Sequence, residues 1–199
     1  MDESIRKRLK GIKPFRYFLF NSSIEALKNL LFLAQAYVES DLSSLGIQLC
    51  VIGKLKGDDY SNAVEEIVRR EPGILLTGYV QESSKLDLYL NAMALLSPSL
   101  VEGFGIPVLD AACLGMPTLA SDCESHCEIQ SMLDFNESVI TLNTLKSRDW
   151  ASAMEAVAGL NGTLWKDPTS ERCRRIGRYQ KLSAGFYERL QHDLGEILK

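Results

Sequence analysis

Short apolar runs alternate with segments in which apolar residues recur every three or four positions along most of this chain. A short, continuous apolar run bounded by Gly, Pro or Asn is typical of a buried strand. The pattern predicts six such strands, over residues 15–20, 47–52, 73–77, 92–96, 118–121 and 138–142.

The segments between these runs have the spacing of helices that bury one face. In the first of them, for example, Leu27, Leu30, Leu31 and Ala34 recur at that spacing. The spacing predicts helices over residues 24–38, 60–70, 82–91, 107–114, 150–160 and 172–199, and Gly185 could interrupt the last of them.

Apolar strands that alternate with amphipathic helices are typical of a parallel sheet covered on both faces. The fold class predicted is therefore α/β. The connections between successive parallel strands should be right-handed. We expect a doubly wound, Rossmann-like parallel sheet of about six strands with helices on both faces. Residues 1–14 are expected to be a linker or interdomain segment, residues 15–165 the Rossmann-like domain, and residues 166–199 a C-terminal helical extension.

The composition limits the classes of protein to which the chain can belong. Its 199 residues are 46% hydrophobic and 24% charged, which is ordinary for a globular protein with a full core. The formal net charge of −4, without a basic block, argues against nucleic acid as a partner. The sequence has no apolar run of about 18 residues, so we expect no transmembrane segment. The charged first ten residues have no apolar stretch behind them and do not resemble a secretory signal.

The chain has five cysteines at irregular spacing, which suits a reducing compartment, so we expect a cytoplasmic location. Cys123, His126 and Cys127 could suggest a metal site. They lack a second pair of ligands, and adjacent His and Cys side chains do not easily converge on one ion. We therefore expect no metal and interpret these cysteines as small apolar filler.

Residues 97–122 organise the rest of the chain. Pro98 ends an apolar strand, Pro107 suits the first turn of a helix, and Gly115 suits the position just past the end of that helix. One carboxylate, Glu102, lies in the loop before this helix, and a second, Asp110, lies one turn inside it. The segment is therefore predicted to run strand, glycine-bearing loop, helix, strand.

In a doubly wound sheet, ligands bind beyond the carboxyl ends of the strands, where the strand order reverses. The N-terminus of the helix favours a phosphate or diphosphate there. Gly103 and Gly105 remove Cβ atoms where a ligand would approach, and Glu102 can accept hydrogen bonds from hydroxyl groups. This combination fits a nucleotide sugar. The alternative is that the glycines only form a tight turn and that the carboxylates are ordinary solvated acids.

The segment P-S-L-V-E-G-F-G-I-P-V-L-D-A-A-C-L-G-M-P-T-L-A-S-D, residues 98–122, resembles the donor-site segment of retaining glycosyltransferases of family 4. The resemblance continues in S-I-E-A-L-K-N-L at residues 23–30, in residues 48–53 and in residues 76–80, and covers about residues 10–130. It implies the C-terminal half of a GT-B fold. It also implies a nucleoside-diphosphate sugar as donor substrate, with no cofactor and no metal.

The resemblance assigns roles to individual residues. Glu102 matches a glutamate that faces the hydroxyls of the donor sugar, and Lys28 matches a lysine that neutralises the leaving diphosphate, so both are expected to be catalytic. Asp110 matches a glutamate that holds the ribose hydroxyls, and it is one methylene shorter, about 1.5 Å of reach. The other expected donor-binding residues act through backbone groups: Gly103, Phe104, Gly105 and Ile106 toward the sugar and diphosphate, and Tyr79 and Val80 toward the base.

The chain departs from the family pattern at the phosphate-binding position. Leu27 replaces the arginine beside the lysine, and Asn21 and Ser22 replace a turn that usually contains glycine. Lys54 or Lys56, after the second strand, could supply the missing cation, or both could be solvated surface lysines.

Family members carry a preceding acceptor-binding domain that usually supplies a catalytic histidine, and neither His126 nor His192 lies where that histidine belongs. We therefore expect an N-terminal acceptor-binding domain in the full-length protein or in a partner chain, and no sugar transfer without it. The resemblance implies the donor-binding half of a glycosyltransferase that transfers a sugar with retention of configuration. The alternative is a degenerate, non-catalytic binding or scaffold module.

Overall fold

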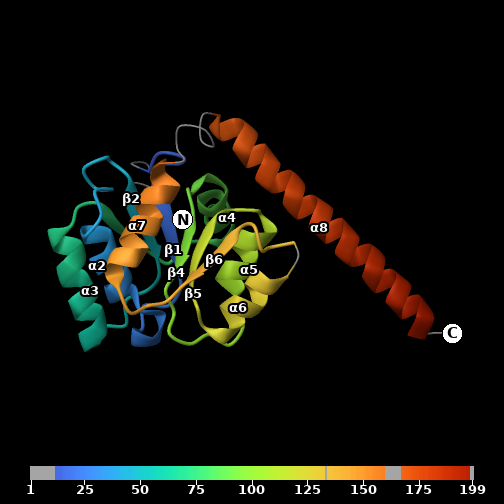
Figure 1. The fold of residues 1–199 in the computed structure, drawn as a ribbon, viewed down its shortest axis with the longest axis horizontal. Coiled ribbons are helices and arrows are strands. Elements are labelled where there is room, and N and C mark those ends of the chain that lie inside the picture. Colours follow the sequence, from blue (N-terminus) through green and yellow to red (C-terminus); the bar gives the residue numbers. More distant parts are fainter. Residues whose placement is uncertain (1–11, 133, 160–166, 198–199) are drawn as a thin grey trace.

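Six parallel strands form one sheet at the centre of the computed structural model, which describes residues 12–132, 134–159 and 167–197 (Figure 1). The strands are β1 (Tyr17–Asn21), β2 (Gln48–Ile52), β3 (Ile74–Gly78), β4 (Leu95–Ser97), β5 (Thr118–Ser121) and β6 (Val139–Leu142). Their order in the sheet is β3-β2-β1-β4-β5-β6, and every neighbouring pair is parallel. The fold class predicted from the sequence is confirmed.

The order of the strands reverses between β1 and β4. The chain builds outward from β1 through β2 to β3 and then returns to place β4 on the free side of β1, where Leu19 pairs with Leu95. Because parallel strands end at the same edge of the sheet, the loops after β1 and β4 lie side by side. Ligands of doubly wound sheets bind at such a reversal.

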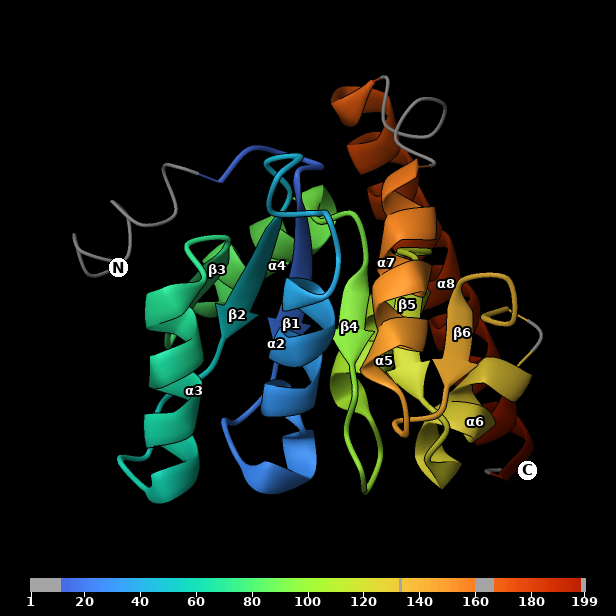
Figure 2. The same ribbon diagram turned by 60° about the vertical axis from the view of Figure 1, so that its left-hand side comes forward.

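Helices cover both faces of the sheet (Figure 2). Successive residues of a strand point to opposite faces. Phe18 and Phe20 of β1 accordingly pack on one side, and Tyr17 and Leu19 on the other. The first face is covered by α2 (Leu30–Val38), α3 (Asp59–Arg70) and α7 (Ser147–Gly159), and the second by α4 (Glu82–Asn91), α5 (Ile106–Cys113) and α6 (Glu124–Ser131).

The helix predicted over residues 24–38 is wrong in its first half. Residues Ala26–Lys28 form a 3-10 turn, η1, and α2 begins only at Leu30. Asn29 separates the two elements because its φ of 57° is left-handed, a conformation that asparagine tolerates better than most residues. The break keeps Lys28 out of α2 and in the connection that follows β1.

The helix α6 is not predicted by the sequence pattern. The helix reads E-S-H-C-E-I-Q-S, so Ile129 is its only large aliphatic residue. Two of its three buried residues, Ser125 and His126, are polar. A buried face of this composition does not produce the apolar periodicity by which the other helices were recognised.

The remaining differences are at element boundaries. β1 begins at Tyr17, because Phe15 lies in a turn with a φ of 53°. The last helix, α8 (Pro168–Ile197), continues through Gly185 without a break. The predicted division into linker, domain and extension stays a prediction, and residues 1–11 and 160–166 lie outside the described residues.

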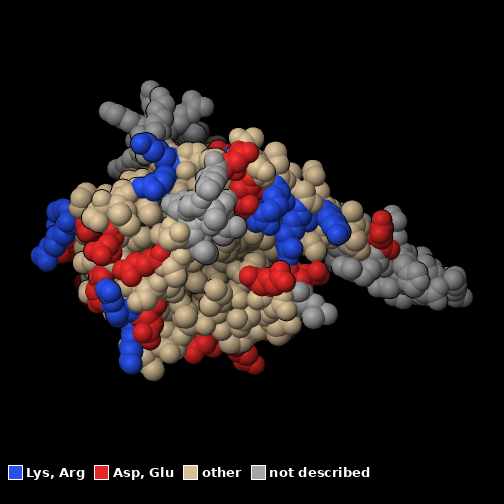
Figure 3. All heavy atoms as spheres, turned by 45° about the horizontal axis from the view of Figure 1, so that its top comes forward, with Lys and Arg blue, Asp and Glu red and all other residues tan. Residues whose placement is uncertain are grey.

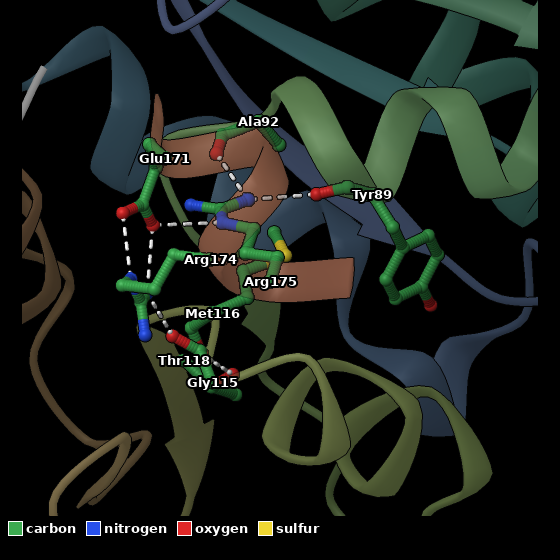
Figure 4. A network of polar contacts seen from close by, with 8 residues as sticks. All are labelled: Tyr89, Ala92, Gly115, Met116, Thr118, Glu171, Arg174 and Arg175. Carbon is green, nitrogen blue, oxygen red and sulfur yellow. Dashed lines mark hydrogen bonds and ion pairs between the residues drawn. The ribbon is translucent and has the colours of Figure 1, made fainter. Parts of the chain in front are cut away.

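A buried arginine attaches the start of α8 to the domain (Figure 4). Arg175 is fully buried, and its Nη1 donates to the carbonyl oxygens of Tyr89, at 2.8 Å, and Ala92, at 2.9 Å, where α4 ends. Its Nε donates to Glu171 Oε1 at 3.0 Å, and its guanidinium lies 5.2 Å from the centre of the Phe15 ring. A cation at the C-terminus of a helix satisfies carbonyl groups that lack helical partners.

The carboxylate of this pair is held in its charged form. Burial would raise the pKa of Glu171, but hydrogen bonds from Arg174 and Arg175 outweigh burial and keep that pKa below its ordinary value. Further along α8, Arg178 donates to the carbonyl of Asp134 and Leu182 packs against the apolar core, and the helix then continues to its C-terminal end (Figure 1).

Acidic and basic side chains alternate on the face that carries the start of α8 (Figure 3). Arg172 of α8 pairs there with Asp87 of α4, at 2.7 Å between Nη1 and Oδ1.

None of the described helices is long and apolar enough to span a membrane.

Replacing Arg175 should cost far more stability than replacing its neighbour Arg172. Arg175→Ala leaves the carbonyl groups of Tyr89 and Ala92 without their donor and takes one partner from Glu171, so we expect a loss of about 3 kcal/mol. Arg172→Ala breaks a surface ion pair and should cost less than about 1 kcal/mol. Urea denaturation followed by circular dichroism measures both values, and equal losses would show that Arg175 does not anchor α8.

Candidate functional site

An ion pair joins the loops that follow β1 and β4. Lys28 Nζ lies 2.7 Å from Glu102 Oε1, and the two side chains are 19% and 11% exposed. Ser99 Oγ donates to the same carboxylate oxygen at 2.9 Å. The structure thus brings together the two residues that were expected to be catalytic, at the point where the strand order reverses.

Backbone contacts hold this ion pair in place. The N–H of Leu100 donates to the carbonyl of Leu27 at 2.8 Å, which fixes η1 to the loop after β4. Ser125 Oγ of α6 donates to the carbonyl of Glu102 at 2.9 Å. An ammonium group has three N–H donors, and Glu102 takes one of those on Lys28. No second partner of this ammonium lies among the described residues, so its other donors can meet an anion.

The two glycines of the loop differ in what the structure requires of them. Gly105, the N-cap of α5, has a φ of +77°, and a Cβ there would lie 3.0 Å from His126 Cδ2. Gly103 has no left-handed φ, and among the described residues no atom lies within 4 Å of where its Cβ would be. Only Gly105 is required by the conformation and packing of the loop.

A cleft of about 340 Å³ opens beside this loop, between the ends of β1, β2 and β3 and the start of α5. Of the expected site residues, Tyr79, Val80, Ile106 and Asp110 line it. Tyr79 is 70% exposed, whereas Val80 is buried. The cleft is lined by Asn21, Ser22, Ser23, Ile52, Gly53, Lys54, Tyr79, Val80, Glu82, Lys85, Ile106, Pro107 and Asp110.

The expected site residues therefore fall into two neighbouring groups. Lys28 and Glu102 form the ion pair, and the cleft holds the four residues named above. Gly103, Phe104 and Gly105 join the two groups, since they connect Glu102 to the start of α5. Phe104 is 62% exposed.

Charged groups of both signs face the cleft. Lys85 Nζ of α4 pairs with Glu82 Oε1 at 2.7 Å. Partial burial raises the pKa of the Asp110 carboxyl, the negative charge of Glu82 adds to this rise, and the positive charge of Lys85 opposes it.

The two lysines that could replace the family's arginine differ in position. Lys54 lines the cleft, whereas Lys56 pairs with Glu25 outside it. Leu27, which stands in place of that arginine, is 53% exposed. Asn21, part of the unusual turn, donates from Nδ2 to the Tyr89 hydroxyl at 2.8 Å and so ties the end of β1 to α4.

The cysteines do not converge with other metal-ligating side chains in the described part of the chain, which holds no group of three or more His, Cys, Asp or Glu residues suited to a metal. All five are free thiols, and only Cys50 is buried. The interpretation of Cys127 as apolar filler is wrong, because it is exposed.

Sequence reasoning missed the polar side chains beneath the loop. Ser97, Ser99 and Ser121 lie at or just after the carboxyl ends of β4 and β5 and are buried, as are Ser125 and His126 of α6. A serine at the end of a continuous apolar run is a signal that could have identified Ser97 and Ser121, since strand ends are where polar ligands meet such a sheet.

Alanine substitutions at the two loop glycines should differ in their effect on the free energy of unfolding. Gly105→Ala forces a Cβ against His126 at a left-handed φ and should lower the free energy of unfolding by about 1–2 kcal/mol. Gly103→Ala is the matched control and should change it by less than about 0.5 kcal/mol. Denaturation midpoints measure both. If the two substitutions have the same effect, Gly105 is not conformationally required.

Comparison with known proteins identifies the family of this chain. The family model for "Glycosyl transferases group 1" matches residues 1–179. The chain is 31% identical over 115 residues, 57% of its length, to the O-antigen chain mannosyltransferase B of Escherichia coli. Anabaena HepE in complex with UDP superposes on 94% of the chain with a TM-score of 0.66 and 14% identity. The pneumococcal O-GlcNAc transferase GtfA in complex with UDP and GlcNAc superposes on 95% with a TM-score of 0.62 and 21% identity.

Because HepE and GtfA are only 14% and 21% identical to this chain, their similarity shows a shared fold alone. The chain spans 30% of the mannosyltransferase, 54% of the HepE chain and 37% of the GtfA chain. Because the family model covers most of the sequence, this protein belongs to the group 1 glycosyl transferases.

Proposed function

We propose that this chain is the donor-binding half of a retaining glycosyltransferase of family 4, and that it holds a nucleoside-diphosphate sugar where the strand order reverses. The observation that carries the proposal is the ion pair between Lys28 and Glu102, which lies beside the N-terminus of α5 and next to the cleft. Membership of the group 1 family supports a transferase. HepE and GtfA were both solved with UDP, which supports a donor of this class.

The diphosphate binds at the N-terminus of α5. The first N–H groups of a helix have no partner within it, and they carry the positive end of the helix dipole. The N–H groups of Gly105 and Ile106 and the free donors of Lys28 reach the diphosphate. The sugar lies on the N–H groups of Gly103 and Phe104, with its hydroxyls donating to Glu102.

The nucleoside occupies the cleft. Backbone groups at Tyr79 and Val80 contact the base where β3 ends. The Asp110 carboxylate accepts hydrogen bonds from the ribose hydroxyls, and its shorter side chain requires the ribose to lie about 1.5 Å nearer to α5 than a glutamate would.

In the reaction, the bond between the anomeric carbon and the diphosphate oxygen breaks, and its electron pair leaves with the diphosphate. The acceptor oxygen forms the new bond on the same face of the sugar, which retains the configuration, and its proton passes to the leaving phosphate oxygen. Lys28 and the N-terminus of α5 stabilise the negative charge that develops on the diphosphate, the largest electrostatic demand of the step. We propose no cofactor and no metal in this step.

The acceptor is held by an N-terminal domain of the full-length protein or by a partner chain. The greater length of the relatives supports this, since the chain spans only part of each. The domain alone should bind the donor weakly and transfer no sugar. Its five free cysteines support a reducing compartment such as the cytoplasm.

Replacing Glu102 should weaken binding of a sugar nucleotide more than binding of the bare diphosphate. The carboxylate contacts the sugar, so Glu102→Ala should reduce affinity for the sugar nucleotide about tenfold, equivalent to about 1.4 kcal/mol. Calorimetric titration with UDP, GDP and ADP and with UDP-GlcNAc, GDP-mannose and ADP-glucose measures both affinities.

Glu65→Ala, at an exposed position on α3, is the control for this titration and should change neither affinity. An equal loss for sugar nucleotide and diphosphate in Glu102→Ala would remove Glu102 from the sugar site. No binding of any of these compounds by the unmodified domain would favour the scaffold module.

The two lysines after β2 should differ in their effect on diphosphate binding. Lys54 lines the cleft and can take over the charge that Leu27 lacks, so Lys54→Ala should weaken binding of the nucleoside diphosphate by roughly three- to fivefold. Lys56→Ala is the matched control, because Lys56 is engaged with Glu25. Binding of the nucleoside without phosphates should be unchanged in both. If Lys56→Ala gives the larger loss, the assignment of Lys54 is wrong.

A further inference from the structure

His126 lies buried beneath the loop that joins Glu102 to α5. Its side chain is fully buried, and α6 carries it to the space under Gly105, where a Cβ on the glycine would lie 3.0 Å from Cδ2 and 3.4 Å from Nε2. The ring therefore forms the surface on which the N-terminus of α5 rests. The imidazole also reaches the ends of two strands, Ser97 of β4 and Ser121 of β5.

The hydrogen bonds around the ring determine which nitrogen carries the proton. Ser121 Oγ donates its single proton to the carbonyl of Ser99, so it can only accept from His126 Nδ1, which lies 3.0 Å away. The carbonyl of Ser121, 3.2 Å from Nδ1, is also an acceptor. Nδ1 must therefore carry the hydrogen, and Nε2 presents its lone pair to Ser97 Oγ at 3.5 Å.

These contacts connect the ring to the ion pair. His126 Nδ1 donates to Ser121 Oγ, and Ser121 Oγ donates to the backbone of Ser99. Ser99 Oγ then donates to Glu102 Oε1, which pairs with Lys28. We call this series of hydrogen-bonded residues, His126, Ser121, Ser99 and Glu102, the serine relay. It runs from the floor of the loop to the carboxylate that is proposed to hold the sugar.

The surroundings of the ring favour its neutral form. Burial lowers the pKa of His126 and the Lys28 ammonium adds to this, whereas the Ser121 carbonyl and the Glu102 carboxylate oppose it. Among the described residues of the other elements, serines of β4 and β5 contact the ring. The backbone of Gly105 also lies against it, at the positive end of the α5 dipole. On α6 itself, Cys127 and Glu128 are exposed.

We propose that His126 is a positioning residue for donor recognition: its neutral Nδ1–H tautomer holds the serine relay and thereby fixes the carboxylate of Glu102 where the sugar hydroxyls bind. The inference rests on the proposed function. It makes His126 responsible for the preference of the site for a sugar nucleotide over the bare diphosphate, although the ring touches neither.

The test uses the preference ratio, which is the affinity for the best-binding sugar nucleotide of the titration divided by the affinity for the matching nucleoside diphosphate. His126→Leu fills the space but removes the Nδ1 donor, and should reduce this ratio about fivefold, equivalent to one hydrogen bond. His126→Asn keeps an N–H at the Nδ1 position and should retain the ratio. A purely structural role would lower the stability of both variants and leave the ratio unchanged in both, which would overturn the proposal.

Two further measurements keep the proposal open to refutation. Ser121→Ala removes the middle of the relay with little loss of volume, and should reduce the ratio as His126→Leu does; an unchanged ratio would contradict the relay. Nitrogen-15 NMR of the ligand-free protein at neutral pH should show Nδ1 protonated and Nε2 bare, and the reverse tautomer would overturn the proposal. If the unmodified domain binds no sugar nucleotide, the proposed function and the role in recognition both fail, whereas the tautomer measurement still decides whether the relay exists.

Discussion

The reversal of strand order between β1 and β4 is the constraint on which the rest of the site depends. The helices that follow these two neighbouring strands, α2 and α5, lie on opposite faces of the sheet, so the loops leading to them diverge and leave room between them. Lys28 and Glu102 bridge this space from its two sides. The two loops meet because β4 pairs with β1.

The ion pair has a consequence for the protein without a donor. Both side chains are largely buried, so removing either one would leave the other charge without its partner in a poorly solvated place. Glu102 therefore holds the cation of Lys28 in position. The serines and His126 beneath the loop extend this arrangement, because Ser99 donates to the carboxylate and Ser121 links Ser99 to His126.

The sheet could be predicted from the sequence because each strand is a continuous apolar run, and such runs report burial on both faces. The strand over residues 118–121 was predicted at its observed bounds for this reason. The start of α2 was not, because a single left-handed residue, Asn29, overrides a good apolar periodicity. The helix α6 was missed because its buried face contains Ser125 and His126.

The candidate site was accessible to sequence reasoning mainly through its resemblance to a family. The local spacing indicated a carboxylate before a helix. Its partner Lys28, however, lies in the connection after another strand. Hydrophobic periodicity carries no information on strand order, so it could not show that the two residues meet. The buried contacts of Arg175 and His126 could not be predicted, because they depend on which helix ends and strand ends meet in space.

A crystal structure of the domain with a bound nucleoside-diphosphate sugar would show where the diphosphate and the sugar lie. We expect the diphosphate at the N–H groups of Gly105 and Ile106 and at Lys28 Nζ, with a sugar hydroxyl donating to Glu102. A donor bound elsewhere, with Lys28 and Glu102 paired only to each other, would contradict the proposed function.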